Sequence, residues 1–595
     1  MGLLKELFQC RTALEGIDQS KAAEIKKHII QQNIYGVDIE RGAVDIARLR
    51  FWLSLIVDEE TPQALPNLDF KIMQGNSLLE QYKGVDLSTM TDAKWKANES
   101  LSIFDNMLDV YRRDMRIMIT QYYDCTNHDQ KQSLKKQILE NVKDQLIEQH
   151  INPKDIDVNL SENNQFFLWH TWFFDVFSLG GFDIVIGNPP YINISKVPQY
   201  SKELESYKEI HTGYNDLMYY FLYHGLSILK QNGILNMITS NYFLGNDYAL
   251  KLRNVLKEKL MRLYNFHSAL IFESANVHTC ISFATNNVKE SDVHFYIYKY
   301  DKKKGEIDFN VDFSNIVINR DSLANTWIIA NSNSALIIGK LLKDSIPLGK
   351  IAEIEQGSKS GKNKIFTVPR EFAVLNKFES GIVRNNVKNG DVLKYYIKDR
   401  GNCLLYTDND TDINKYPNAK SYLEQYKMVL MGRNEVAKGL YKWYRFDRPR
   451  RKEIFDAKEK IIVPYRAEHN RFAYDGCQYF NDGGDIRAIV IKNEKYPIKY
   501  VLGILNSSLM DWFFGFIGKV KGRVREYFNN PLSQIPIKGC SSVVQETIIK
   551  LVDKILSAKR SNPSADTSAL ESEIDRLVYQ LYGLTEEEIA IIEKK

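Results

Sequence analysis

The residues best suited to chemistry are Asn188, Pro189, Pro190 and Tyr191, which directly follow the apolar run 182–187. Two successive prolines stiffen this turn and leave the Asn188 amide oxygen and the Pro189 carbonyl oxygen as hydrogen-bond acceptors. An amino group on a base is a poor nucleophile because its lone pair is delocalised into the ring. Two acceptors that bind its hydrogens favour the reactive geometry, and an aromatic ring can stack on the base. We therefore predict a site that activates an amino group.

The predicted secondary structure supports a functional turn. The same residue types occur in ordinary turns that end strands, but ligands of α/β proteins bind at the carboxyl ends of parallel strands. Short apolar runs alternate with amphipathic stretches here, which predicts parallel strands joined by helices and an α/β fold class. The expected strands are 34–39, 70–73, 182–186 and 234–238, and the expected helices are 42–57 and 216–230.

Length and composition predict a globular protein of several domains. A chain of 595 residues holds roughly three to five domains, and a hydrophobic content of 44% excludes a disordered chain. Residues 88–170 are polar with helical periodicity, which predicts a helical insertion. Residues 345–540 are expected to form a second globular unit, followed by packing helices at 542–558 and 567–582.

Cysteine usage and apolar segments favour a reducing cytoplasm. The six cysteines are scattered, without a CxxC pair or the spacing of zinc ligands. The first residues lack the apolar core of a signal peptide. The nearest candidate for a membrane span, residues 500–518, is interrupted by polar residues, so we expect it to be a buried core segment.

The positive charge is concentrated in one region. The net charge is +4, but residues 341–540 hold about 36 Lys and Arg against about 23 Asp and Glu. A segregated basic surplus suits a nucleic-acid partner, because neutralisation of phosphates supplies much of the affinity for nucleic acid. The alternative is a solvated basic face without a partner.

At these motifs the sequence resembles the amino-group DNA methyltransferases that use S-adenosylmethionine. The resemblance is to the adenine-N6 enzymes of type IIG restriction-modification systems with a Taq-type specificity domain, and it runs over nearly the whole chain. The turn at Asn188-Pro189-Pro190-Tyr191 looks like the family's catalytic motif. The segments 33–60, 70–78, 212–244 and 270–285 are similar to the second, third, fifth to sixth, and eighth motifs.

The resemblance implies where S-adenosylmethionine would bind. Asp38, with Ile39 beside it, would hold the ribose hydroxyls, and a carboxylate at a strand end suits two hydroxyl donors. Asn76 or Ser77 would lie near the cofactor's adenine, although many family members have Asp there. Asn188 would adjoin the cofactor as well.

The resemblance also implies which residues meet the target base. Asn188, Pro189 and Pro190 would be catalytic, and Tyr191 would stack on a base flipped out of the duplex. Phe272 would be a second aromatic on that base, and plain core packing is the alternative for it.

The second unit resembles the Taq-type specificity domain at residues 351–366, 381–397, 443–475, 501–514 and 532–537. The loop 357–364 does not match a phosphate-binding GxxxxGK[ST] loop, since its spacing is one residue short and Asn363 replaces Ser or Thr. A basic loop against DNA phosphates is expected instead, with a solvated surface as the alternative. The candidate DNA contacts are Lys359, Lys362, Lys364, Arg384, Lys388 and Arg466, together with Tyr465 and His469.

One family motif has no counterpart in this sequence. Family members carry a glycine-rich first motif under the amino-acid end of the cofactor, and Met1-Gly2-Leu3-Leu4 resembles the segment that follows it. We therefore expect the chain to begin just after that motif and to lack the first, central strand, so that alone it binds cofactor weakly or not at all. No nuclease constellation is found. The expected partner is an N-terminal fragment or subunit that carries the first motif and a nuclease domain.

These expectations combine into one assignment. It comprises a partial Rossmann-like methyltransferase domain (1–87 and 171–335), a helical insertion (88–170), an α+β specificity domain (345–540) and C-terminal helices (541–595). The predicted reaction is methyl transfer from S-adenosylmethionine to N6 of adenine in double-stranded DNA, without a metal. Two alternatives stay open: transfer to cytosine N4 or another amine, and a catalytically inactive DNA-binding fragment that needs an N-terminal partner.

Overall fold

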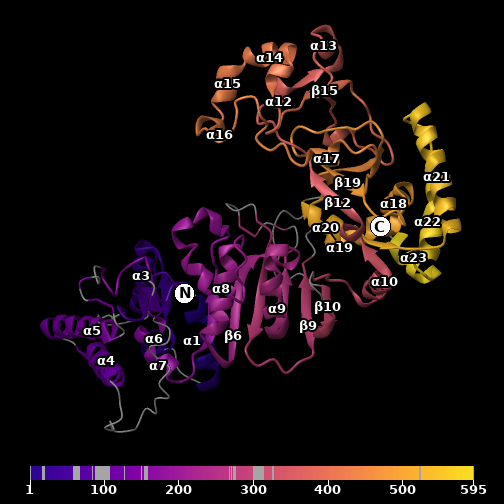
Figure 1. The fold of residues 1–595 in the computed structure, drawn as a ribbon. Helices are drawn as coiled ribbons and strands as arrows, with labels where there is room; N and C mark the ends of the chain where they lie inside the picture. The colour runs from indigo at the N-terminus through magenta and orange to yellow at the C-terminus, as the bar shows by residue number, and fades with distance from the viewer. Residues whose placement is uncertain are drawn as a thin grey trace. The chain divides into compact units, whose positions relative to one another are not determined.

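The computed structural model describes residues 2–593 except 16–20, 58–67, 83–84, 87–106, 126, 149–150, 153, 155–157, 267–268, 270, 273–276, 299–313, 324–326 and 522–523. Parts of the predicted helical insertion (88–106) and of the eighth-motif match (270 and 273–276) lie outside the described residues. The fold is mixed α/β (Figure 1). It divides into a first unit (Met1–Ser240, Tyr248–Leu263 and Cys280–Glu290) and a second unit (Asn241–Asp247, Tyr264–Thr279 and Ser291–Lys595).

Two pairs of parallel strands carry the candidate site residues of the first unit. Strand β1 (Gly36–Asp38) pairs with β2 (Ile72–Gln74), and β5 (Phe182–Gly187) pairs with β6 (Leu229–Ser240). Strand β5 is the edge of a six-stranded sheet of order β10-β9-β7-β8-β6-β5. Its other strands are β7 (Leu260–Asn265), β8 (Thr279–Thr285), β9 (Asp292–Ile297) and β10 (Ser314–Asn319). A short hairpin is formed by β3 (Gln81–Tyr82) and β4 (Val85–Asp86).

The crossovers between paired strands are helical, as the alternating pattern predicts. Helix α3 (Arg41–Ile56) joins β1 to β2, and α8 (Leu217–Ser227) joins β5 to β6. The predicted helix 216–230 ends earlier than expected, because Leu229 already begins β6. The other helices of this unit are α1 (Gly2–Glu15), α2 (Ala22–Asn33), α4 (Met107–Asp124), α5 (His128–Glu148), α6 (Trp169–Trp172), α7 (Phe174–Phe177) and α9 (Leu250–Lys259).

Helices α1 to α3 share one apolar core with the strand β2. Leu4, Ile29, Phe51 and Leu55 are almost fully buried there, together with Ile72 of β2. The predicted helical insertion contains α4 and α5, which lie side by side (Figure 1). The predicted domain bounds remain predictions.

The second unit is built from small antiparallel sheets and helices. Their strand orders are β12-β19-β16-β18, β13-β15-β14, β17-β21-β20 and β11-β22. The strands are β11 (Ser345–Pro347), β12 (Ala352–Gln356), β13 (Thr367–Pro369), β14 (Val383–Asn385), β15 (Asn402–Leu405), β16 (Lys460–Pro464), β17 (Arg466–Ala467), β18 (Ala473–Asp475), β19 (Ile486–Ile491), β20 (Lys519–Lys521), β21 (Val524–Glu526) and β22 (Pro536–Lys538).

The two longest helices of the second unit lie where the sequence predicts them. These are α21 (Ser542–Ser561) and α22 (Ser568–Leu581), and α23 (Glu586–Glu593) follows as a helix that the periodicity did not predict. The remaining helices are α10 (Ser332–Leu342), α11 (Leu348–Ile351), α12 (Asn363–Phe366), α13 (Arg370–Leu375), α14 (Pro417–Glu424), α15 (Lys427–Met431), α16 (Asn434–Ala437), α17 (Lys452–Phe455), α18 (Ile498–Leu505), α19 (Ser508–Ile517) and α20 (Asn529–Ser533).

The apolar segment 500–518 is core, as predicted. It forms α18 and α19, whose Tyr500, Leu502 and Phe514 are fully buried in the core cluster to which α21 and α22 also contribute. Within the described residues no single helix has the length and apolar character of a membrane span. The pair α18 and α19, bent by 70°, meets those criteria only when both helices are taken together.

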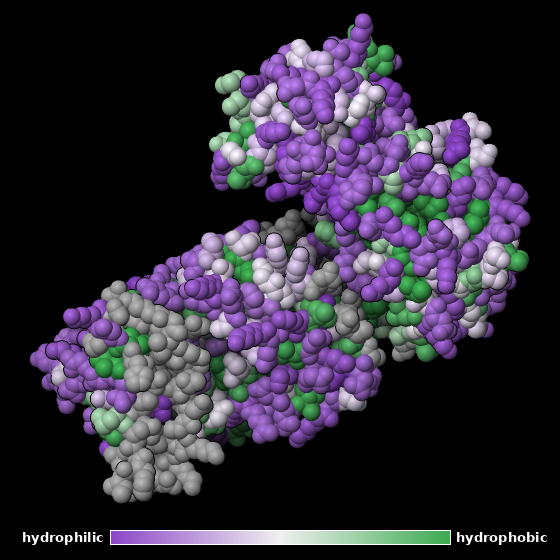
Figure 2. All heavy atoms as spheres, viewed as in Figure 1, coloured by the Kyte–Doolittle hydropathy of each residue, from purple (hydrophilic) through white to green (hydrophobic). Residues whose placement is uncertain are grey.

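The surface in Figure 2 is mostly hydrophilic, with hydrophobic side chains gathered over α15 and α16. The exposed apolar residues there are Met428, Val429, Met431 and Leu440.

Candidate active site and basic loops

The turn at Asn188 to Tyr191 lies at the carboxyl end of β5, as predicted. Gly181 enters the strand with φ of 113°, and a Cβ there would lie 2.6 Å from the Ile228 carbonyl oxygen, so glycine is required. Because Gly187 lies opposite Met237, the turn begins beside Ile238 near the end of β6. Asn188 is exposed at this end of the sheet, whereas Pro189 is buried.

Tyr191 holds the turn together through its hydroxyl group. The hydroxyl donates its one hydrogen to Asn188 Oδ1 at 2.8 Å, and the Ile238 carbonyl oxygen, at 3.3 Å, is a second, more distant acceptor for the same hydrogen. Burial, with a smaller contribution from Cys280, raises the pKa of Tyr191 to about 12, so the hydroxyl stays protonated and donates at neutral pH. An amide oxygen has two lone pairs, and Asn188 Oδ1 can therefore still accept from another donor.

The loop after the turn is fixed on the start of α8. The Leu217 N–H donates to the Ile192 carbonyl oxygen at 2.7 Å, and the Ile194 N–H donates to the Asn215 carbonyl oxygen at 3.0 Å. The buried Asn215 side chain in turn accepts from the backbone and hydroxyl of Thr212. This anchoring gives the candidate site a rigid rim.

A second set of predicted residues follows β1. Asp38 is exposed, and its Oδ1 accepts from the Glu40 N–H at 2.8 Å in a local turn. Its carbonyl oxygen accepts from Gly75 at 2.9 Å, and the Gln74 amide donates to the Ile39 carbonyl oxygen at 3.0 Å. Asp38 and Gln74 are register partners, so both lie at the carboxyl ends of their strands. The carboxylate is thus presented where a ligand can reach it.

Asn76 and Ser77 are more enclosed than Asp38. Asn76 is buried, and its Oδ1 accepts from the Leu78 N–H at 3.2 Å. The Ser77 carbonyl oxygen accepts from the Trp169 indole at 2.9 Å. The structure therefore places both residues in an anchored turn after β2, and their contact with a cofactor stays a prediction.

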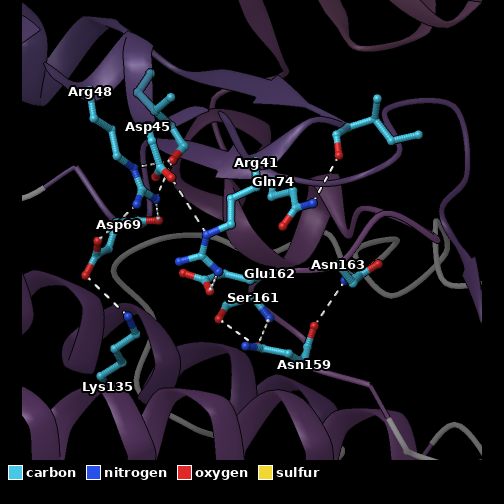
Figure 3. A network of polar contacts seen from close by, with 12 residues as sticks. Arg41, Asp45, Arg48, Asp69, Gln74, Lys135, Asn159, Ser161, Glu162 and Asn163 are labelled. Atoms are coloured by element: carbon cyan, nitrogen blue, oxygen red, sulfur yellow. Dashed lines mark hydrogen bonds and ion pairs between the residues drawn. The ribbon is translucent and has the colours of Figure 1, made fainter. Parts of the chain in front are cut away.

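Ion pairs and hydrogen bonds connect α3 and the segment before β2 to neighbouring elements of the first unit (Figure 3). Arg41 of α3 contacts Glu162 at 2.7 Å, and Arg48 donates to the Ile72 carbonyl oxygen at 2.6 Å. Asp69 contacts Arg48 at 3.6 Å and Lys135 of α5 at 3.4 Å. The helical insertion is therefore tied to the segment that leads into β2.

Phe272 lies in the second unit and is half-buried. Its predicted stacking on a target base stays a prediction.

In the second unit the basic loop 357–364 is anchored on one acidic side chain. Asp482, which is buried, accepts from the Ser360 N–H at 2.8 Å and from the Ser360 hydroxyl at 2.6 Å. Its carbonyl oxygen accepts from the Asn363 amide at 3.0 Å. Lys359 exchanges two backbone hydrogen bonds of 2.9 Å with Arg448. The loop is a fixed platform, and it is not a phosphate-binding loop of the GxxxxGK[ST] type.

The side chains predicted to contact DNA differ in their exposure and in whether they form ion pairs within the protein. Arg384 is paired with Asp456 at 3.3 Å and is mostly buried, and Arg466 contacts Glu526 at 2.6 Å with its side chain half exposed. His469 contacts Asp511 at 3.0 Å. The exposed lysines are Lys359, Lys362, Lys364 and Lys388.

Sequence patterns alone did not identify the partners that orient these groups. Ile238 is 47 residues from Tyr191, and Asp482 is 122 residues from Ser360. Such contacts depend on strand register and loop placement, for which neither local periodicity nor spacing carries a signal.

Comparisons with known families match both parts of the chain. The model of the Eco57I restriction-modification methylases matches residues 32–277, and the model of the TaqI-like C-terminal specificity domain matches residues 387–537.

Individual relatives are similar over most of the chain. A Methanocaldococcus jannaschii protein named as a type II restriction enzyme and methyltransferase, RM.MjaORFECS2P, is 25% identical over 97% of this chain and 51% of its own length. The Escherichia coli type II restriction enzyme and methyltransferase RM.Eco57I is 25% identical over 59% of this chain and 40% of its own. This chain thus spans about half, or less, of the lengths of these relatives.

The fold is shared with known restriction-modification enzymes of solved structure, for example MmeI. The type IIL restriction-modification enzyme MmeI, solved in complex with DNA, superposes with a TM-score of 0.54 at 12% identity, over 99% of this chain and 75% of MmeI. The fold, the turn after β5 and the two family matches agree. The chain therefore combines an Eco57I-type restriction-modification methylase domain with a TaqI-like C-terminal specificity domain.

Proposed function

We propose that this chain carries the methyl-transfer site of a site-specific DNA methyltransferase that modifies N6 of adenine in double-stranded DNA, within a restriction-modification system. The observation that carries the proposal is the exposed Asn188 amide at the carboxyl end of β5, with Tyr191 bonded to it at 2.8 Å. The methylase family match supports the same reaction class.

The residues at the ends of β1 and β2 suit S-adenosylmethionine. The exposed Asp38 carboxylate can accept hydroxyl groups of a ribose, with Ile39 beside it. Asn76, Ser77 and Asn188 would complete the contacts. When bound, the cofactor supplies an electrophilic methyl group.

Asn188 and Pro189 act on the amine of the base. Their side-chain and carbonyl oxygens accept its two hydrogens, which directs the nitrogen lone pair toward the methyl group. Tyr191 stacks on the base after the base has left the duplex. No covalent bond between enzyme and base is needed.

The second unit holds the DNA. Four exposed lysines suit phosphate contacts: Lys359, Lys362, Lys364 and Lys388. Arg384 and Arg466 would contribute if each left its carboxylate partner, Asp456 or Glu526, to bind a phosphate. The specificity-domain match supports this role.

The test measures methylated nucleosides directly. The chain is incubated with DNA and millimolar labelled S-adenosylmethionine, so that weak cofactor binding does not limit the reaction, and the DNA is digested to nucleosides for mass spectrometry. We expect N6-methyladenine, which Asn188→Ala abolishes. The matched control is Asn232→Ala, because Asn232 lies at the opposite end of β6.

The other outcomes separate the alternatives. Label found in N4-methylcytosine would show that cytosine, and not adenine, is the target base. Salt-sensitive DNA binding with no methylated nucleoside would contradict the proposal and identify a DNA-binding specificity module.

A further inference from the structure

The second unit carries an exposed apolar tip, which comprises residues 426–443 and includes the short helices α15 and α16. Figure 2 shows hydrophobic side chains gathered over these two helices. Met428 is 83% exposed and Leu440 is 68% exposed. Met431, one helical turn from Met428 on α15, is exposed as well. A contiguous apolar patch on a protein surface marks an interaction site.

Positive charge accompanies the apolar tip. Residues 427–450 contain seven Lys and Arg but only two acidic residues. Both acids are paired within the protein, since Glu435 contacts Arg448 at 3.9 Å and Asp447 contacts Arg433 at 2.8 Å. The exposed cations of this segment are Lys427, Lys438, Lys442, Arg448 and Arg450. The tip therefore suits a partner that presents apolar surface between negative charges.

One buried arginine joins the apolar tip to the basic loop 357–364. Arg433 donates to the Leu430 carbonyl oxygen at 3.1 Å and to the Trp443 carbonyl oxygen at 2.6 Å, which connects α15 to the end of the tip. Its guanidinium group also donates to the Ser360 carbonyl oxygen at 2.6 Å. These contacts fix the tip beside the basic loop, so a loop that binds phosphates also brings the tip to the duplex.

Asp447 makes a second connection between the tip and the basic loop. The Tyr441 hydroxyl donates to Asp447 Oδ1 at 2.7 Å. Gly361 of the loop, with φ of 79°, lies so close that a Cβ there would be 2.1 Å from Asp447 Oδ2. Only glycine fits this approach. The tip is thus held in place by polar contacts, while Met428 and Leu440 stay exposed to solvent.

We propose that the apolar tip enters the minor groove of duplex DNA, where Met428 wedges between two base pairs with Leu440 beside it and bends the duplex. This inference rests on the proposed function, because the basic loop must hold the phosphates. Duplex DNA presents apolar base faces between two rows of phosphates, which matches apolar side chains flanked by lysines. The minor groove is about 6 Å wide, which excludes a helix but admits side chains. The tip also lies within the specificity-domain match at 387–537.

The experiment measures the bend of a DNA duplex directly. A duplex of about 30 base pairs, long enough to report a local kink, is selected by the full chain from a random pool and labelled with a dye at each end. Energy transfer between the dyes is recorded with and without the chain, in the absence of S-adenosylmethionine. We expect the bound duplex to be bent by about 20–90°, the range for apolar wedges.

Variants locate the wedge. Met428→Gln with Leu440→Gln keeps the approximate size of both side chains and all the neighbouring lysines. We expect the bend to be lost and Kd for the duplex to rise at least about fivefold. The salt dependence of binding should stay that of the parent chain, because the phosphate contacts remain. Val374→Gln with Leu375→Gln is the matched control and should change neither bend nor Kd, since both residues are at least 72% exposed on α13 of the same unit.

Several results would overturn the proposal. They are a duplex that binds but stays straight, a bend that the Met428 and Leu440 variant retains, and a dimer of the chain alone that this variant abolishes. Weaker binding to a duplex with uracil in place of thymine, seen with the parent chain but not with the variant, would instead place these side chains against thymine methyl groups in the major groove.

Failure here is distinguishable from failure of the proposed function. The bend is measured without methyl transfer, so a straight duplex that is still methylated would contradict the wedge alone. No binding of any duplex would contradict both the wedge and the proposed DNA-binding role of the second unit.

Discussion

At the scale of single residues, Tyr191 has two separable parts. Its hydroxyl joins Asn188 to the Ile238 carbonyl group, and its ring is the proposed stacking surface. Tyr191→Phe keeps the ring and loses a hydrogen bond worth about 1 kcal/mol, so we expect kcat/KM for methyl transfer to fall roughly fivefold.

Removal of the ring should cost more. Stacking of a base on an aromatic side chain contributes about 1–3 kcal/mol, and Tyr191→Ala should therefore lower kcat/KM by roughly 10- to 100-fold. Equal losses in both variants, measured by the nucleoside assay, would mean that the hydroxyl and not the ring is needed.

A buried ion pair in the second unit is expected to contribute to stability. Lys460 Nζ lies 2.7 Å from Asp475 Oδ2, and both side chains are fully buried. Burial lowers the pKa of Lys460, and the charge of Asp475 opposes that shift. Lys460→Met leaves the Asp475 carboxylate without its cation, so we expect a loss of about 3–5 kcal/mol in the free energy of unfolding.

Urea denaturation measures this loss. The exposed neighbour Lys458 provides the control, and Lys458→Met should change stability by less than about 0.5 kcal/mol. If the two variants unfold at the same urea concentration, the pair has no structural role.

At the scale of elements, Asp69 ties the helical insertion to β2. Burial would raise the pKa of Asp69, but the hydrogen bond from Tyr122 and the charges of Lys135 and Arg48 outweigh it and lower the pKa below 3.8. A lowered carboxylate pKa stabilises the fold fully above the ordinary value. The stabilisation is lost as the pH falls through the lower folded value.

Melting temperatures across pH test this contribution. Asp69→Asn should melt below the parent chain at neutral pH, and the difference should shrink below about pH 4. Asp129→Asn, an exposed change on α5, serves as the control. A difference between Asp69→Asn and the parent that is independent of pH would argue against the ionic origin.

The elements that follow local rules were predictable from the sequence. Hydrophobic periodicity and the residues that end elements predicted the strand 34–39 and the helix 42–57, and the two prolines predicted the turn at Asn188. The structure has β1, α3 and the end of β5 at these places. The sequence predicted that the helix runs to residue 230, whereas α8 ends at Ser227. Ile228 and Leu229 fit a buried helix as well as a strand, so their periodicity could not decide between the two. The orienting partners Ile238 and Asp482 could not be predicted, since their contacts arise only from the tertiary arrangement.

At the scale of the whole molecule, the charge distribution predicts salt-dependent DNA binding. Each phosphate that the protein neutralises adds about 0.9 to the steepness with which log K falls against log salt. Substitution of Lys359, Lys362 and Lys364 by alanine should therefore flatten the slope in proportion to the number of phosphates that these lysines neutralise. The slope is measured by titration of duplex DNA at several salt concentrations.

Exposed lysines on α21 give the matched control. Lys550 and Lys554 are exposed on α21, and their alanine variants should leave the slope unchanged. Equal slopes for both sets of variants would place the DNA-binding surface elsewhere on the chain.

Strand β5 has a consequence for the amount of this protein in a cell. Among the described strands it is the edge of its sheet, and its Ile184 and Ile186 are 46% and 58% exposed. An edge strand with exposed isoleucines is a template for aggregation, and exposed apolar surface is what chaperones and proteases select. The steady-state level of this chain therefore depends on how long that strand stays exposed as well as on the rate of synthesis.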